Sequence, residues 1–172
     1  DRLIYDFKTK KAIQNASRLI MTSQATQSQV EKYYPNAKGR SVVVYQAVDP
    51  AFYGDGHVQR TRETNAPYFV YQSSFTQRKN HAVLVDAFAL IQHQTDWNLT
   101  LIGLNGPTLA AVQLQIEKLG LGNRITCLVD QSRQEMIDCV TGAAGFVYPS
   151  LNEGFGIPLA ESLAAGLPMA VS

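Results

Sequence analysis

Residues 146–172, FVYPSLNEGFGIPLAESLAAGLPMAVS, decide the fold. The apolar run at 145–150 is typical of a buried strand, and a turn containing two glycines follows it. Helix-forming residues then occupy about 156–165, and the apolar run at 168–172 is typical of a second strand. A strand, a helix and a strand in this order predict a parallel βαβ unit with a right-handed crossover.

The same alternation extends upstream to residue 68. Strand-like apolar segments are separated by segments with helical periodicity, and SRQE at 132–135 has the residues of a capping box. The expected strands are 68–74, 97–105 and 125–131, and the expected helices run from about 80 to 95 and from 107 to about 119. We therefore predict an α/β domain built on a Rossmann-like parallel sheet with helices on both faces.

A charged, glycine-containing stretch at 54–66, GDGHVQRTRETNA, has almost no apolar residues and is predicted to be a linker. It separates a segment at 1–53, interpreted as the end of a first domain, from a second domain at 67–172. The first segment is expected to contain helices at 3–16 and 24–34 and strands at 18–23 and 42–49. The chain begins with Asp1 and stops on a strand, so we expect a piece of a longer polypeptide, incomplete at its C-terminus.

Composition excludes several classes of protein. Fifteen Lys and Arg balance fourteen Asp and Glu without a basic cluster, which argues against a nucleic-acid partner. No apolar run reaches the ~20 residues of a membrane span, and no signal peptide is visible. Cys127 and Cys139 lack the spacing of a metal site, so we expect reduced core residues of an intracellular protein.

Two strand-to-helix junctions carry the chemistry. Ligands of parallel sheets bind outside the carboxyl ends of the strands. SSFTQRKN at 73–80 places Arg78 and Lys79 at the start of a helix, and SLNEGFG at 150–156 places glycines at the start of another. Helix N-termini bind anions. Two cations beside one of them favour a diphosphate, which they would help to leave by neutralising its developing charge.

The acids of the second junction favour a different part of such a ligand. Glu153 and Glu161 would repel phosphate, but each carboxylate can accept hydrogen bonds from two neighbouring hydroxyls of a sugar. Gly154 and Gly156 let the backbone approach a ligand closely. The arrangement suits a sugar–diphosphate–ribose chain lying across the helix start.

Each of these residues also has a plainer interpretation. Glu153 alone could be a solvated loop acid, and Glu161 alone an ordinary acid on a helix surface. Arg78 and Lys79 alone could be a solvated pair. His81, at the helix start beside Lys79, could contact phosphate but is expected on the surface.

At these residues the sequence resembles a known family. EGFGIPLAE at 153–161 resembles the E-x7-E motif of retaining glycosyltransferases of the GT-B fold, family 4 (glycosyltransferase group 1), and SFTQRKN at 74–80 is similar to the family's SFEPRKN. ASRLIMTSQAT and VVVYQAVDPAFY resemble the end of the N-terminal domain, so the resemblance covers nearly all 172 residues. It implies transfer of a sugar from a nucleotide donor with retention of configuration, without a metal or other cofactor.

The resemblance also implies roles for individual residues. It implies donor binding by Arg78, Lys79, Glu153, Gly154, Phe155, Gly156, Ile157 and Glu161. In this family pattern Glu161 would bind the ribose, Glu153 the hydroxyls of the donor sugar, and the backbone amides of residues 155–157 the sugar and phosphate. Arg78 and Lys79 would hold the diphosphate, and these two with Glu153 are the residues implied for catalysis.

The implied substrates are a nucleotide-sugar and a saccharide or lipid-linked acceptor, in glycan or polysaccharide biosynthesis. SSFTQRKN is most similar to mannosyltransferases, which favours GDP-mannose over UDP-sugars, although VDQ at 129–131 replaces the family's GYV near the base. We expect a cytoplasmic location, with peripheral attachment to the inner membrane face through the absent N-terminal half. Since GT-B enzymes react in the cleft between two domains, this fragment is expected to bind donor but to be inactive alone.

Two other functions remain open at this point. A non-catalytic nucleotide-sugar-binding module would have the same site. An NAD-type dinucleotide-binding domain would use GFGIPL as a glycine-rich loop, but this segment is G-x-G-x-x-Leu and lacks the third glycine.

Overall fold

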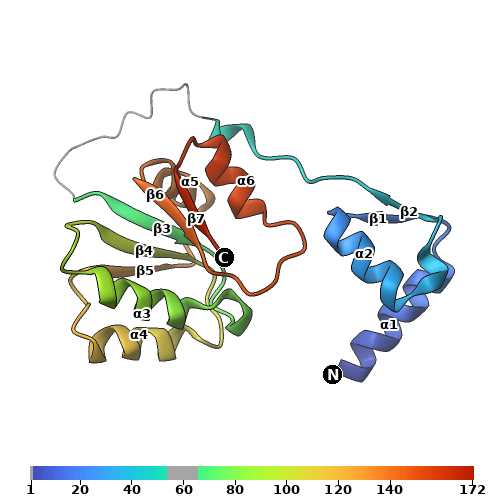
Figure 1. Ribbon diagram of the computed structural model, residues 1–172, viewed down its shortest axis with the longest axis horizontal. Helices are drawn as coiled ribbons and strands as arrows, with labels where there is room; N and C mark the ends of the chain where they lie inside the picture. Colours follow the sequence, from blue (N-terminus) through green and yellow to red (C-terminus); the bar gives the residue numbers. More distant parts are fainter. Residues whose placement is uncertain (1, 54–65) are drawn as a thin grey trace. The chain divides into compact units, whose positions relative to one another are not determined.

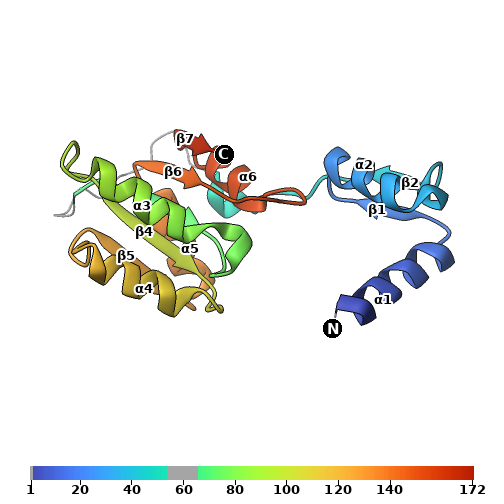
Figure 2. The same cartoon turned by 60° about the horizontal axis from the view of Figure 1, so that its bottom comes forward.

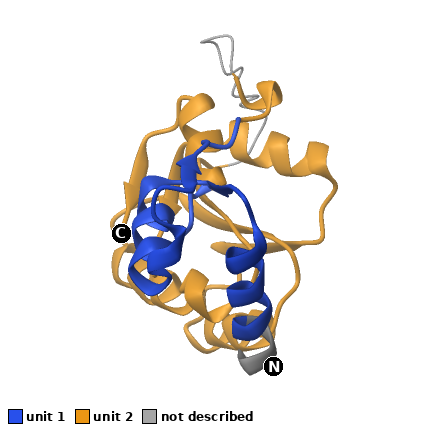
Figure 3. Ribbon diagram, turned by 90° about the vertical axis from the view of Figure 1, so that its right-hand side faces the viewer, with its two compact units in different colours: residues 1–47, 153–156 blue, residues 48–152, 157–172 orange. Residues whose placement is uncertain are grey.

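The computed structural model describes residues 2–53 and 66–172. The chain divides into two compact units, one of residues 1–47 with 153–156 and the other of residues 48–152 with 157–172 (Figure 3). The predicted linker at 54–66 lies outside the described residues, except for its last residue.

The first unit is small and mostly helical. In chain order it contains α1 (Arg2–Asn15), β1 (Leu19–Met21), α2 (Gln24–Tyr33), the 3-10 helix η1 (Pro35–Ala37) and β2 (Ser41–Val43). The two strands are parallel, with Leu19 opposite Ser41. The strand predicted at 42–49 is too long, because β1 offers only three residues to pair with. Val44 and Tyr45 beyond it are more than half exposed.

The second unit is the predicted α/β domain (Figure 1). Its elements are η2 (Pro50–Phe52), β3 (Tyr68–Gln72), η3 (Gln77–Lys79), α3 (His81–Ile91), β4 (Asn98–Gly103), α4 (Leu109–Lys118), β5 (Ile125–Val129), α5 (Arg133–Thr141), β6 (Gly145–Tyr148), α6 (Ile157–Ala164) and β7 (Met169–Val171). The sheet has the order β5-β4-β3-β6-β7, and every pair is parallel. The strand order reverses between β3 and β6, where ligands of such sheets bind.

Helices cover both faces of this sheet, as predicted. Helices α3 and α4 lie side by side on one face in both views, and α5 and α6 lie on the other (Figures 1 and 2). The core between the layers includes the fully buried Val70 and Leu101. Phe52 of η2 is also fully buried in this core, and η2 packs against α5 and α6. Residues 48–53 therefore group with the second unit, whereas the sequence placed them at the end of the first.

Two helices differ from prediction at one end. Helix α4 begins at Leu109 rather than at 107, because the chain before it is held in a turn. There Thr108 N–H donates to the Phe75 carbonyl at 3.2 Å, and Gly106 N–H donates to Asn105 Oδ1 at 2.7 Å. Helix α3 ends at Ile91, four residues earlier than predicted.

The predicted capping box of α5 is confirmed. The Glu135 carboxylate accepts a hydrogen bond from Ser132 N–H at 2.8 Å, and the Ser132 hydroxyl accepts one from Glu135 N–H at 3.3 Å. This reciprocal pair starts α5 at the carboxyl edge of the sheet.

The two cysteines are free thiols that pack, half-buried, against the core of the second unit. Burial raises the pKa of Cys139 to about 11. Among residues 2–53 and 66–172 no three His, Cys, Asp or Glu side chains are grouped to bind a metal ion, and no helix is long and apolar enough to span a bilayer.

Candidate functional site

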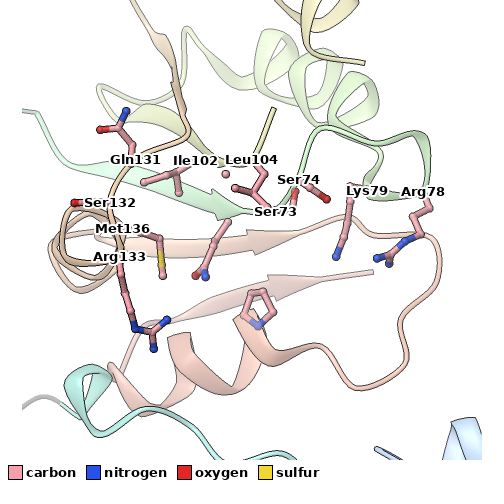
Figure 4. Close-up of a pocket in the computed structure, with 13 residues that line it drawn as sticks. Ser73, Ser74, Arg78, Lys79, Ile102, Leu104, Gln131, Ser132, Arg133 and Met136 are labelled. Carbon is pink, nitrogen blue, oxygen red and sulfur yellow. The ribbon is translucent and has the colours of Figure 1, made fainter. Parts of the chain in front are cut away.

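A cavity of about 460 Å³ lies at the carboxyl edge of the sheet in the second unit (Figure 4). Its lining comes from the ends of β3 and β4, the segment before α3, the start of α5 and the first turn of α6. The lining residues are 72–74, 78–79, 102–104, 131–133, Met136 and Pro158. Strand β3 pairs with β6 at the point where the strand order reverses.

The two junctions singled out from the sequence are joined by hydrogen bonds. The Arg78 carbonyl accepts from Leu151 N–H at 2.9 Å and from the Ser150 hydroxyl at 3.3 Å. The Arg78 guanidinium in turn donates to the Asn152 carbonyl at 2.9 Å. The segment after β3 and the segment after β6 therefore form one continuous rim.

Arg78 and Lys79 both line the cavity but differ in environment. Arg78 is exposed, whereas the Lys79 side chain is only 6% exposed and points toward the cavity (Figure 4). The Lys79 ammonium donates to the Tyr148 hydroxyl at 3.4 Å and lies 5.4 Å from the centroid of that ring. Burying an ammonium group is costly, so a buried lysine at a ligand-sized cavity favours an anionic ligand.

His81 is buried, and its predicted place on the surface is wrong. Only 2% of its surface is exposed, and its ring stacks on Phe75 with a centroid distance of 4.4 Å. The left-handed backbone of Asn80 (φ 57°) turns the chain between η3 and α3. His81 Nε2 lies 3.0 Å from the Ser73 hydroxyl oxygen. Burial, and secondly the charge of Lys79, lowers the pKa of His81 to about 4.

This pKa predicts that the protein loses stability in mild acid. The unfolded chain binds a proton at His81 below the ordinary pKa of 6.5, but the folded chain does not until about pH 4. The free energy of unfolding should therefore fall by about 3 kcal/mol between these values because of this residue. Urea unfolding across this range tests it. His81→Gln should flatten the decline, and His93→Gln, an exposed control, should not; equal profiles would contradict the prediction.

Glu161 is held beside the cavity by a residue that lines it. The residue is 6% exposed, and its Oε2 accepts a hydrogen bond from Gln72 Nε2 at 2.9 Å. Burial raises the pKa of Glu161, while the bond from Gln72 and the charge of Arg133 oppose that shift. A buried carboxylate has few water molecules to donate hydrogen bonds to it. The hydroxyls of a ligand could supply these donors at the Glu161 oxygens.

Gln72 and Arg133 were not singled out from the sequence. Arg133 lines the cavity from the start of α5 (Figure 4). It forms an ion pair with Asp49, with its Nε at 3.2 Å from Asp49 Oδ2. The pair is largely exposed and adds little stability. The capping box could have identified Arg133, because it places the residue after Ser132 at the carboxyl edge of the sheet. Gln72 carried no comparable signal.

The glycine loop at 153–156 belongs to the first compact unit, not to the second. There the Gly154 carbonyl accepts from the Thr26 hydroxyl at 3.0 Å. Phe155 lies with its ring centroid 5.9 Å from that of Tyr45. Gly156 takes a positive φ of 83°, which favours glycine, and Ile157 begins α6.

The chain is similar in sequence to known glycosyltransferases. The chain is 26% identical to the O-antigen chain mannosyltransferase RfbU of Salmonella typhimurium, over 99% of this chain and 46% of the relative. It is 28% identical to a D-inositol 3-phosphate glycosyltransferase of Corynebacterium glutamicum, over 93% of this chain and 42% of the relative. The chain therefore spans less than half the length of these relatives.

Solved structures share its fold. HepE of Anabaena, in a crystal structure with UDP and glucose, matches with a TM-score of 0.78 and 22% identity over 93% of this chain and 45% of that one. Sucrose-phosphate synthase of Thermosynechococcus elongatus matches with a TM-score of 0.79 and 22% identity, over 95% and 42%. The model of the family "Glycosyl transferases group 1" matches residues 56–172, more than half of the chain. This chain, with its parallel sheet of the GT-B type, belongs to the glycosyl transferases group 1 family.

Proposed function

We propose that this chain binds a nucleoside-diphosphate sugar as part of a retaining glycosyltransferase. The single observation that carries the proposal is the buried Lys79 ammonium facing a ligand-sized cavity where the strand order reverses. Arg78 adds a second cation to the same rim, and the pair matches the two charges of a diphosphate.

The proposed roles follow from the charges. Lys79 and Arg78 hold the diphosphate and neutralise the charge that builds on it as the sugar leaves. Glu161 accepts hydrogen bonds from the ribose hydroxyls, with Gln72 orienting its carboxylate. Glu153 accepts from the hydroxyls of the donor sugar, and Gly154 and the amides of residues 155–157 approach the sugar and phosphate. These last roles rest on the sequence resemblance.

The proposed donor is GDP-mannose, with UDP-sugars as the alternative. The similarity to an O-antigen mannosyltransferase supports the first, and the similarity to HepE, crystallised with UDP, supports the second. The proposed acceptor is a saccharide or a lipid-linked saccharide. A cytoplasmic site of action, with peripheral attachment to the membrane through a preceding domain, is part of the same proposal.

We further propose that the diphosphate needs no metal ion, because Lys79 and Arg78 supply the positive charge. The affinity for GDP or UDP should then be the same in EDTA and in magnesium. A strong dependence on magnesium would contradict this part of the proposal.

Isothermal titration calorimetry with GDP, UDP and NAD tests the ligand class. We expect GDP or UDP to bind in the micromolar to millimolar range and NAD not to bind. Binding of NAD with no binding of GDP or UDP would instead support the dinucleotide-binding alternative.

The second candidate, a non-catalytic nucleotide-sugar module, predicts the same titration. The discriminating measurement is sugar transfer by a longer protein that includes the preceding domain, with and without Glu153→Ala. Transfer that the substitution abolishes supports the enzyme. Sugar transfer by the 172-residue chain alone would contradict the expectation that both domains are needed.

Glu161→Gln separates binding from stability. The variant should bind the nucleotide roughly tenfold or more weakly, because a charge-assisted acceptor of the ribose is lost. Because burial raises the pKa of Glu161, the folded carboxyl holds its proton to higher pH than the unfolded one. Ionisation therefore costs stability above the ordinary pKa of 4.5, and the variant should unfold at higher urea at pH 7 but not below pH 4.

The matched control for this variant is Glu117→Gln, at an exposed position of α4. It should change neither the affinity nor the pH profile. Equal behaviour of the two variants would show that Glu161 neither binds the nucleotide nor costs stability when ionised.

A further inference from the structure

A second cavity, of about 200 Å³, lies on the other side of the segment that carries Lys79. It opens at the first turns of α3 and α4, and its lining includes Thr76, Asn80, His81, Thr108, Ala111 and Gln115. It shares no lining residue with the larger cavity. Nothing in the proposed reaction uses it.

Three hydrogen-bonding atoms around this cavity have no partner among the described residues. They are Thr76 Oγ1, His81 Nδ1 and Thr108 Oγ1, and all three are buried. Buried polar side-chain atoms are satisfied in the large majority of cases, by protein or by bound molecules. Three such atoms from three segments around one cavity therefore indicate a polar occupant.

The chemistry of the lining favours an occupant that accepts hydrogen bonds. Helices α3 and α4 are eleven and ten residues long, and neither has a side-chain hydrogen bond at its N-cap. The Leu109 N–H of α4 donates to the Gly106 carbonyl at 3.1 Å, but among the described residues neither helix start has a side-chain acceptor for the N–H groups that follow. The Thr76 and Thr108 hydroxyls can donate. His81 Nδ1 carries a proton when Nε2 accepts from the Ser73 hydroxyl.

The charges around the cavity agree with such an occupant. None of the acidic side chains in the described part of the chain lines it. The nearby Asp86 carboxylate is not part of the lining and accepts a hydrogen bond from Gln115 Nε2 at 2.6 Å. The Lys79 charge is close enough on the opposite side to act on the His81 ring.

We propose that this cavity binds an oxyanion of the phosphate class, held by the Thr76 and Thr108 hydroxyls, His81 Nδ1–H and the first amides of α3 and α4. The volume exceeds that of a single tetrahedral oxyanion, so a phosphomonoester also fits. Binding fixes the proton of His81 on Nδ1, and Nε2 then accepts from Ser73, whose side chain lines the larger cavity. The His81 ring thereby connects this site to the larger cavity, where the donor is proposed to bind.

Titration of the 172-residue chain with inorganic phosphate, followed by ¹H–¹⁵N NMR, tests the proposal. We expect saturable shifts of the Ala82 and Ala111 amides and a His81 ring with its proton on Nδ1. Thr108→Val removes one donor and keeps the side-chain shape, so it should fold normally and weaken binding roughly tenfold or more. Thr126→Val, at an exposed position of β5, is the matched control and should bind as the parent does.

Three outcomes would overturn the proposal. One is the absence of saturable shifts at α3 and α4. Another is shifts confined to the rim of the larger cavity, such as Ser74 and Leu104. The third is equal affinity of Thr108→Val and the parent chain. Failure of GDP and UDP to bind would contradict the proposed function but would leave this site untouched.

Discussion

Lys79→Met is expected to weaken GDP or UDP binding by roughly tenfold to a hundredfold, because a charge-assisted hydrogen bond to the diphosphate is lost. The same change should leave the free energy of unfolding unchanged or raise it. Lys79 is 6% exposed, and an apolar side chain of similar length avoids the cost of desolvating its ammonium. Calorimetry measures the first effect and urea unfolding the second.

Lys118→Met is the matched control, since Lys118 is exposed in the last turn of α4. It should not change the affinity. Unchanged nucleotide affinity of Lys79→Met would contradict the proposed function, which depends on this cation. A large loss of stability would show instead that Lys79 serves the fold.

Gly103→Ala is expected to destabilise the second unit by about 3 kcal/mol or more. A Cβ at this position would lie 1.9 Å from the Ser73 carbonyl oxygen and 3.2 Å from the Ser74 nitrogen. Both neighbours are backbone atoms, so β3 and β4 would have to separate at their carboxyl ends. The bond from Ser73 N–H to the Ile102 carbonyl, now 2.9 Å, would be disturbed, and with it the rim of the cavity.

Gly122→Ala provides the comparison, because no atom lies within 4 Å of the added Cβ and its φ is not positive. Its free energy of unfolding should stay within about 0.5 kcal/mol of the parent's or rise slightly. Equal losses in the two variants, measured by urea unfolding, would contradict the close approach of β3 and β4 at this edge.

The architecture of the second unit could be predicted because its signals are local. Apolar runs separated by helical periodicity determine a parallel sheet, and Ser132 with Glu135 determines the start of α5. The errors at the start of α4 and the end of β2 have tertiary causes. Whether a strand continues depends on its partner, and β1 is simply too short to extend β2.

The charged residues of the candidate site could be predicted from the sequence, but which of its residues are buried could not. Arg78 and Lys79 were identified together, yet only Lys79 is buried. This difference depends on Tyr148, which reaches Lys79 only because β6 pairs with β3. The burial of His81 likewise depends on ring contacts with Tyr71 and Phe75, and sequence periodicity gives no sign of them.

Three buried polar or ionisable side chains that cost stability lie near this edge of the sheet. Lys79 and Glu161 are ionisable groups that are almost fully buried, and His81 is held neutral with one ring nitrogen unpartnered among the described residues. Each costs stability that an apolar residue would not. Such a concentration is expected where a ligand, rather than the fold, determines the choice of residues.

A crystal structure of the chain soaked with GDP-mannose tests the central claim most directly. The account predicts electron density across the cavity, with a diphosphate oxygen within hydrogen-bonding distance of Lys79 Nζ and ribose hydroxyls at the Glu161 carboxylate. Density bound elsewhere, with no nucleotide at the carboxyl ends of β3 and β4, would contradict it.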